Sequence, residues 1–397
     1  MNNTPNSNRP HIVLYGKTNS GKSSIMNKIL GQDLALVSDK PGTTTDPVQK
    51  AMELIPYGPV LFIDTAGICD FTELGKLREK KTLDMLKRTD LGIYVTDGSH
   101  EELKIFEEWK TNFKKYNIPY FLVINKIDLL SHEQLRLLKS KYEKAYFISQ
   151  EEASGYEALK FDICNELKNS EENQAIVGDL VPYNGKVVMV VPVDSEAPKG
   201  RLILPQVQCI RDCLDHGIKT YVVRDTELAE AIKDLNNIDL VITDSQVFKQ
   251  VDEIVPKNIN LTSFSMLFAR QKGNIADFIE GAKKIDELNV RSRVLICENC
   301  THNVSHEDIG RVKIPALINK YVNENLTYDF IAGQDFPQDV NKYDLVIHCG
   351  GCMVNRKTVL NRINLCKENN VAITNYGIAI AFLTGILERA ASIYKIK

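Results

Sequence analysis

The first residues whose types and spacing could do chemistry form a run from Gly16 to Ser23, with the pattern G-x-x-x-x-G-K-S. The run follows a short apolar stretch, Ile12 to Tyr15, and precedes a helical pattern. In that context glycines let the backbone approach phosphates, and the N–H groups at the start of the helix favour negative charge. Lys22 would contact the β- and γ-phosphates as a catalytic cation, and Ser23 would bind Mg²⁺. The residues expected to bind the nucleotide here are Asn19, Ser20, Gly21, Lys22, Ser23 and Ser24. The alternative is a glycine-rich turn without a ligand.

Two stretches at the ends of later strands predict a guanine nucleotide. Asp64 follows an apolar strand, so its carboxylate can hold Mg²⁺ through water, while the Gly67 N–H can sense the γ-phosphate. Asn125-Lys126-Ile127-Asp128 follows the strand Tyr120 to Ile124. The Asp128 carboxylate can accept from the ring N–H and the exocyclic amine of guanine, a pairing that adenine cannot offer.

Two more segments complete the predicted nucleotide site. Pro41 to Asp46 is a polar loop able to close over Mg²⁺ and the γ-phosphate, with Thr44 as its Mg²⁺-sensing and catalytic residue. Thr43 and Thr45 are competing registers for that role. A strand from 145 to 149 is expected to bring Ser149 to the guanine, although Gln150 stands where many GTPases have alanine.

Composition places the chain among ordinary globular proteins. It has 397 residues, of which 43% are hydrophobic and 25% charged, so it can bury several cores. With a net charge of −3, the chain lacks the excess of basic residues that is typical of proteins that bind nucleic acid. The absence of a long apolar run and of a signal-peptide core argues against a membrane and for a cytoplasmic protein. Nine cysteines in a reducing compartment indicate thiol or metal chemistry.

Alternating apolar strands and amphipathic helices predict an α/β chain of three domains. The first is an N-terminal P-loop GTPase fold, Ras-like or translation-factor-like, and two smaller α/β domains with largely parallel sheets follow it. One long helix from Ile378 to Ile393 is expected to end the chain. The predicted boundaries are a flexible arm 1–10, the GTPase domain 11–170, and domains 178–272 and 273–397.

A second group of chemical residues lies in the last third of the chain. Cysteines and histidines follow the ends of two predicted strands, namely Cys297, Cys300 and His302 after Val294 to Ile296, and His348, Cys349 and Cys352 after Leu345 to Ile347. Open α/β sheets place ligand sites at the carboxyl ends of parallel strands, so neighbouring strand tips would bring the two sets together.

Three interpretations of this group remain open. A zinc site would use Cys297, Cys300, Cys349 and Cys352, although the gap between the pairs is longer than zinc ribbons have. An iron–sulfur cluster would use thiolates with a non-cysteine ligand at one iron. The third interpretation is a set of buried thiols without a ligand. Cys209 and Cys213, four residues apart on one helix, are expected to be a buried pair.

On these motifs the chain resembles the FeFe-hydrogenase maturation GTPases, the HydF family, along essentially its whole length. The resemblance rests on the GTPase motifs, the run Asp194 to Gln206, Cys300-Thr301-His302 and His348-Cys349-Gly350-Gly351-Cys352. The resemblance implies a dimerisation domain at 178–272, an iron–sulfur domain at 273–397, and a homodimer or higher oligomer. It also implies a scaffold that binds a 4Fe–4S cluster and carries a di-iron precursor supplied by radical-SAM maturases. The scaffold would deliver that precursor to apo FeFe-hydrogenase.

The resemblance also implies a ligand set. Cys300, Cys349 and Cys352 match the family's three cysteine ligands. His302, His348 and Glu307 are candidates for the fourth position, which can also hold an exchangeable ligand.

Two GTPase residues bear on the rate of hydrolysis. Ile68 stands where Ras-like proteins carry a water-positioning glutamine, so hydrolysis is expected to be slow. Asn19 is similar to an asparagine that binds K⁺ in a tRNA-modifying GTPase family, and K⁺ there would replace an arginine finger; a purely structural Asn19 is the alternative. A regulatory GTPase of RNA or ribosome association, with a structural zinc domain, is the competing function.

Overall fold

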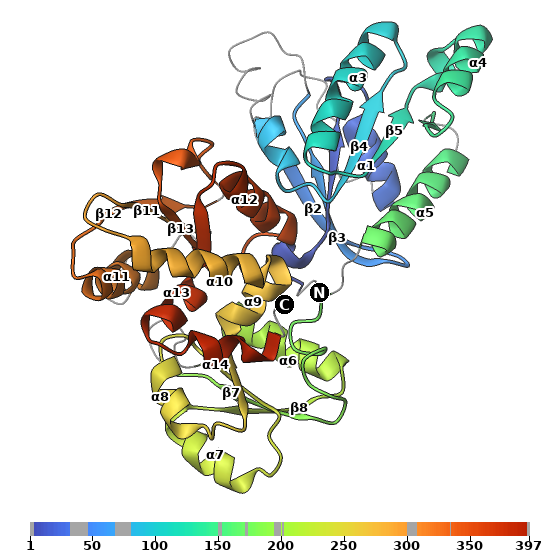
Figure 1. Ribbon diagram of the computed structural model, residues 1–397. Coiled ribbons are helices and arrows are strands. Elements are labelled where there is room, and N and C mark those ends of the chain that lie inside the picture. The colour runs from blue at the N-terminus through green and yellow to red at the C-terminus, as the bar shows by residue number, and fades with distance from the viewer. Residues whose placement is uncertain are drawn as a thin grey trace. The chain divides into compact units, whose positions relative to one another are not determined.

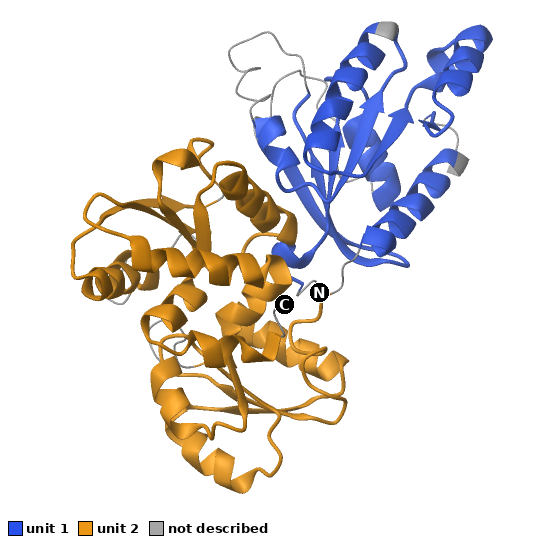
Figure 2. Cartoon of the chain, viewed as in Figure 1, with its two compact units in different colours: residues 1–172 blue, residues 173–397 orange. Residues whose placement is uncertain are grey.

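The computed structural model describes residues 4–31, 47–67, 81–149, 153–170, 174–193, 200, 202–299, 308–333 and 335–394. The chain forms two compact units, Met1–Glu172 and Asn173–Lys397 (Figure 2). Among the described residues no helix is long and apolar enough to cross a membrane.

The first unit is built on a six-stranded sheet in the order β2-β3-β1-β4-β5-β6, in which only β2 runs antiparallel to its neighbour (Figure 1). Its strands are β1 His11–Tyr15, β2 Val48–Leu54, β3 Gly58–Asp64, β4 Leu91–Thr96, β5 Tyr120–Ile124 and β6 Tyr146–Phe147. Its helices are α1 Lys22–Leu30, α3 His100–Lys115, α4 His132–Lys141 and α5 Ala153–Ser170, with 3₁₀ turns η1 Asn6–Asn8 and η2 Ile127–Leu129.

Apolar side chains alternate to both faces of this sheet. Ile12 and Leu14 pack with α1 and α5 on one face, whereas Val13 and Tyr15 pack with α3 on the other. A strand buried on both sides must be apolar throughout, which is why β1 reads as a continuous hydrophobic run. The doubly covered parallel sheet predicted from the sequence is therefore confirmed.

The amino-terminal residues differ from the flexible arm that we expected. Residues 6–8 form η1, and Arg9 is 1% exposed. The Arg9 guanidinium donates to the carbonyl oxygens of Thr4 (3.0 Å), Met52 (3.2 Å) and Val60 (3.5 Å). These contacts tie residues 4–10 to the β2–β3 hairpin. The sequence suggested a polar tail because two of the three acceptors, Met52 and Val60, lie more than forty residues away.

The second unit contains two four-stranded parallel sheets, in the orders β10-β9-β7-β8 and β12-β11-β13-β14. The strands are β7 Lys186–Val190, β8 Lys219–Val223, β9 Leu240–Thr243, β10 Asn260–Ser263, β11 Arg293–Glu298, β12 Thr327–Ala332, β13 Leu345–His348 and β14 Ala372–Asn375. The helices are α6 Leu204–Asp215, α7 Leu228–Asp234, α8 Phe248–Ile254, α9 Phe264–Lys272, α10 Ile275–Lys283, α11 Ile314–Val322, α12 Arg356–Glu368, α13 Tyr376–Leu383 and α14 Leu387–Ala391. Shorter turns are η3 Asp225–Glu227, η4 Lys284–Glu287, the π-helical turn η5 Ile309–Lys313, η6 Val340–Lys342 and η7 Ser392–Tyr394.

One hydrophobic cluster spans both sheets of this unit. It includes Val188 and Val241 from the first sheet and Leu295 and Val346 from the second. In Figure 1 the helices α9, α10, α13 and α14 lie between the two sheets. The two sheets therefore share part of their core.

The end of the chain departs from the single helix expected between Ile378 and Ile393. The helix stops at Leu383, and Gly385 has a φ of 75°, a left-handed conformation that glycine adopts without strain. The chain then resumes as α14 and η7. Elements β2, α4, β10 and α9 were not expected, and β6 is shorter than the predicted strand 145–149.

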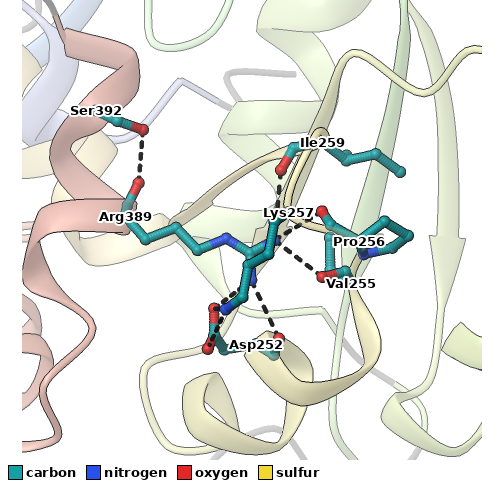
Figure 3. Close-up of polar contacts among 7 residues, drawn as sticks. All are labelled: Asp252, Val255, Pro256, Lys257, Ile259, Arg389 and Ser392. Atoms are coloured by element: carbon teal, nitrogen blue, oxygen red, sulfur yellow. Dashed lines mark hydrogen bonds and ion pairs between the residues drawn. The ribbon is translucent and has the colours of Figure 1, made fainter.

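Arg389 on α14 binds the segment that follows α8, as Figure 3 shows. Its guanidinium donates to the carbonyl oxygens of Val255 (2.9 Å) and Pro256 (2.8 Å) and forms an ion pair with Asp252. A cation at carbonyls beyond a helix C-terminus satisfies groups that the helix itself leaves unpaired. Arg389 therefore fixes α14 to the segment between α8 and β10.

We expect Arg389→Ala to loosen this junction. Hydrogen bonds to a charged group contribute roughly 1.5–3 kcal/mol, so hydrogen exchange in α14 should accelerate by about tenfold or more, measured by mass spectrometry. Arg211→Ala is the matched control, because its ion pair with Asp215 is exposed on one helix face and such pairs contribute only about 0.5 kcal/mol. Equal exchange in the two variants would contradict the assigned role of Arg389.

Candidate functional site

The phosphate-loop motif lies between β1 and α1 and is organised around Lys22. Gly16 and Gly21 have φ values of 139° and 96°, conformations that side chains disfavour. Lys22 is 6% exposed, and its ammonium donates to the carbonyl oxygens of Gly16 (3.0 Å) and Lys17 (2.8 Å). Burial lowers the pKa of Lys22, whereas Asp64 and Glu102 raise it. The two carbonyls therefore hold the Lys22 ammonium at the centre of the phosphate loop.

The predicted guanine motif contacts the phosphate loop directly. The Asn125 side-chain amide donates to the Ser20 carbonyl (3.0 Å), and the Lys126 ammonium donates to the Asn19 carbonyl (2.7 Å). Lys126 has a φ of 57°, while Asp128 is exposed in η2. The two motifs therefore form one site, although more than a hundred residues separate them. Ser149 is buried just after β6, and the preceding carbonyl, that of Ile148, accepts from the Ile127 N–H (3.3 Å).

The residues expected at Mg²⁺ come together at the ends of β1 and β3. The Ser23 hydroxyl donates to Asp64 Oδ2, and the other carboxylate oxygen, Oδ1, is buried without a hydrogen-bond partner. Burial raises the pKa of Asp64, while Lys22 and Ser23 lower it. An orphaned carboxylate oxygen beside a hydroxyl suits Mg²⁺, which prefers oxygen ligands and retains water. A side chain on Gly67 would collide with the backbone of Thr18, so Gly67 packs directly on the phosphate loop.

Several predicted site residues fall outside the described residues, namely Thr44, Ile68, Cys300, His302 and Glu307. Ser24 lies half-buried in the first turn of α1.

The second predicted site lies where β11 and β13 end. The two strands are parallel neighbours, as supposed from the sequence, and the structure pairs Cys297 with His348. The Cys349 N–H donates to the Cys297 carbonyl (2.9 Å), so the segment after β11 and the segment after β13 start side by side. Cys349 and Cys352 are half-buried in the loop that follows. The strand tips therefore bring Cys297 next to the loop that carries Cys349 and Cys352.

Two buried cations accompany these cysteines, and sequence reasoning missed both. The Lys272 ammonium, 4% exposed at the end of α9, donates to the carbonyls of Gly351 (3.0 Å) and Val354 (2.8 Å). Burial lowers the pKa of Lys272 to about 8, although Cys352 and Cys349 raise it. Arg362 on α12 is also 4% exposed. Lys272 follows Arg270 on α9, and Arg362 lies between Lys357 and Lys367 on α12, so no local sequence signal marks either residue.

The cysteine environments differ from one another. Cys297 packs in the hydrophobic cluster shared by the two sheets, and burial raises its pKa to about 12. Burial also raises the pKa of Cys349, but hydrogen bonds from Gly351 and Asn299 oppose that effect. Cys209 and Cys213 are fully buried on α6, as predicted. Within the described residues no three Cys, His, Asp or Glu side chains gather as a metal site.

Comparison with known proteins identifies the class of the first unit. Residues 11–126 match the family model described as 50S ribosome-binding GTPase. GTPase Der of Campylobacter concisus is 31% identical over 202 residues, covering 48% of this chain and 43% of that protein. The tRNA modification GTPase MnmE of Endomicrobium trichonymphae is 38% identical over 124 residues, covering 30% of this chain and 26% of that protein. With the phosphate-loop and guanine motifs in one site, the first unit is a P-loop GTPase domain, followed by two α/β domains with parallel sheets.

Two further family models cover the second unit. Residues 176–273 match the hydrogen maturase F dimerization domain, and residues 276–393 match the hydrogen maturase F tetramerization domain. Together these models span more than half of the chain. The chain therefore belongs to the hydrogen maturase F family, the hydrogenase maturation GTPases, and it carries homo-oligomerisation domains.

The curated relatives named GTPase Der and GTPase Era are matched only in part, since the chain spans less than half of their length. Among solved structures, an Era variant of Aquifex aeolicus bound to GDP.AlF4⁻ is 18% identical with a TM-score of 0.34, covering 54% of this chain and 93% of that one.

Proposed function

We propose that the chain is a GTP-hydrolysing scaffold that binds a 4Fe–4S cluster and a di-iron precursor and delivers the precursor to apo FeFe-hydrogenase. One observation supports the binding of a cluster. The Cys349 N–H donates to the Cys297 carbonyl, so Cys349 lies next to the segment that follows Cys297. Membership of the hydrogen maturase F family supports the maturation part. We propose domain boundaries at 11–170, 178–272 and 273–397. We also propose that the protein is cytoplasmic.

The proposed cluster ligands are Cys300, Cys349 and Cys352, with His302 or Glu307 as candidates for the fourth position. A cluster with three thiolates carries net negative charge, and the buried cations Lys272 and Arg362 fit that charge. Bound there, the cluster would supply one-electron chemistry and an iron open to exchange. Radical-SAM maturases, apo hydrogenase and further copies of this chain are the proposed partners.

The cluster proposal is tested by anaerobic reconstitution of the full chain with iron and sulfide. Iron and sulfide near four per chain, with an EPR signal after reduction, are the expected result. Stoichiometric zinc without an iron signal would instead favour a regulatory GTPase of RNA or ribosome association with a structural zinc domain.

In the GTPase domain, Lys22 would neutralise the β- and γ-phosphates, while Ser23, Thr44 and a water on Asp64 would hold Mg²⁺. The Gly67 N–H would contact the γ-phosphate, and Ser149 would contact the guanine. We propose that hydrolysis to GDP and phosphate is slow and that GTP acts as a switch of domain contacts.

Asp128→Asn is expected to lower the preference for GTP over XTP by at least about 100-fold, because the new amide donor faces donors of guanine but pairs with the extra oxygen of xanthine. Competition binding with labelled GTP measures the preference. Glu133→Gln, an equal charge change on exposed α4, should leave it unaltered. Unchanged discrimination in Asp128→Asn would remove Asp128 from base recognition.

Replacing K⁺ by Na⁺ at constant ionic strength is expected to slow GTP hydrolysis by about tenfold, because we propose that Asn19 helps to bind K⁺ beside the phosphates. Phosphate release measures the rate. Asn19→Ala should be slow in both salts. Equal wild-type rates in K⁺ and Na⁺ would exclude the monovalent cation.

A further inference from the structure

The Cys349 sulfur accepts two hydrogen bonds from a single residue. The Asn299 backbone N–H lies 3.3 Å from Cys349 Sγ, and the Asn299 side-chain nitrogen Nδ2 lies 2.9 Å from it. Asn299 is 7% exposed and directly follows β11, so the pairing of β11 with β13 brings this amide to the Cys349 sulfur.

Arg362 decides which way the Asn299 amide points. Its Nη1 lies 2.7 Å from Asn299 Oδ1, and a guanidinium can only donate. The oxygen of the amide must therefore face Arg362, which leaves the NH₂ group to donate to Cys349. The orientation of the Asn299 amide therefore follows from which atoms can donate and which can accept a hydrogen bond.

His348 completes the arrangement with a defined tautomer. Its Nδ1 lies 2.6 Å from the Cys349 carbonyl, which can only accept, so Nδ1 carries a proton. Its Nε2 lies 2.8 Å from Arg362 Nη1 and accepts from it. The two hydrogens of Nη1 thus serve Asn299 Oδ1 and His348 Nε2. With both ring nitrogens engaged, His348 orients Arg362 and is not available to bind a metal.

We propose that Asn299, oriented by Arg362 and His348, is the positioning residue that sets the reduction potential of the cluster through N–H···S bonds to Cys349. The inference rests on the proposed cluster-binding function. Donors to a ligating sulfur stabilise the more negative, reduced state more than the oxidised state, so they raise the potential. The nearby positive charge of Arg362 acts in the same direction.

The test is a redox titration of the reconstituted full chain, with dithionite as electron donor and EPR as readout. Asn299→Asp keeps an oxygen toward Arg362 but replaces the NH₂ donor by an anionic oxygen. At a fixed potential we expect the ratio of reduced to oxidised cluster to fall at least tenfold, which is about 59 mV for a one-electron couple. Asn299→Ala, which removes the donor without adding charge, should shift the potential in the same direction.

Asn274→Asp is the matched control, because it adds the same charge at an exposed N-cap where aspartate is equally acceptable. Its potential should equal that of the wild type. Normal iron content with an unchanged potential in both Asn299 variants would overturn the inference while leaving the scaffold function intact. Failure of the wild type to acquire iron and sulfide would overturn both.

A second measurement addresses His348 directly. Pulsed EPR of the reduced wild type and of His348→Gln should show the same nitrogen couplings, with the same iron content. Loss of a strong nitrogen coupling only in His348→Gln would make the histidine a ligand and overturn the arrangement.

Discussion

Cys349→Ser is expected to lower the iron bound per chain after anaerobic reconstitution by at least about tenfold, because a serine oxygen is a harder and weaker ligand for iron–sulfur iron. The change also removes the sulfur that accepts from Asn299 at 2.9 Å and 3.3 Å. The loss should include the EPR signal of the reduced cluster. GTP hydrolysis should persist, because Lys22 and the guanine motif belong to the other compact unit.

Cys209→Ala serves as the control for this prediction. Cys209 is fully buried in the same unit but lies on α6, within a separate apolar cluster. Its replacement should leave iron content at the wild-type level, with circular dichroism verifying the fold of both variants. Full iron content in Cys349→Ser would mean that the ligand set proposed for the cluster is wrong.

Lys22→Met is expected to reduce single-turnover GTP hydrolysis by at least about 100-fold. The ammonium is the buried cation of the phosphate loop, and without it the β- and γ-phosphates would lose a direct, charged hydrogen-bond donor. Methionine keeps a long apolar stem in the pocket, so the loss reports charge and hydrogen bonding more than packing. The carbonyls of Gly16 and Lys17 also lose the hydrogen bonds from the Lys22 ammonium, which should weaken loop order before any nucleotide binds.

Lys17→Ala separates this effect from a general loss of positive charge in the loop. Lys22 donates to the backbone carbonyl of Lys17, and the substitution retains that carbonyl. Its hydrolysis rate should remain near that of the wild type, and both variants should reconstitute iron normally. A wild-type rate in Lys22→Met would remove the lysine from the mechanism.

The order of elements around the GTPase site could be predicted from local patterns. The apolar run before Gly16, the helix after Ser23 and the strand before Asn125 appear where expected. Their prediction worked because periodicity and glycine placement report local backbone preferences. The antiparallel strand β2 and the docked residue Arg9 were missed, because their partners lie far along the chain.

For the second site, the sequence alone identified the cysteines, the histidines and the two strands that carry them. Only the tertiary structure decided the register that pairs Cys297 with His348, the burial of Cys297 in the core, and the hydrogen bond from Asn299 to Cys349. Residue types and spacing determine which chemistry a segment can do, because ligand preference and strand propensity are local properties. Strand order, burial and the orientation of Arg362 toward Asn299 depend on contacts between segments about fifty residues or more apart, which no local pattern encodes.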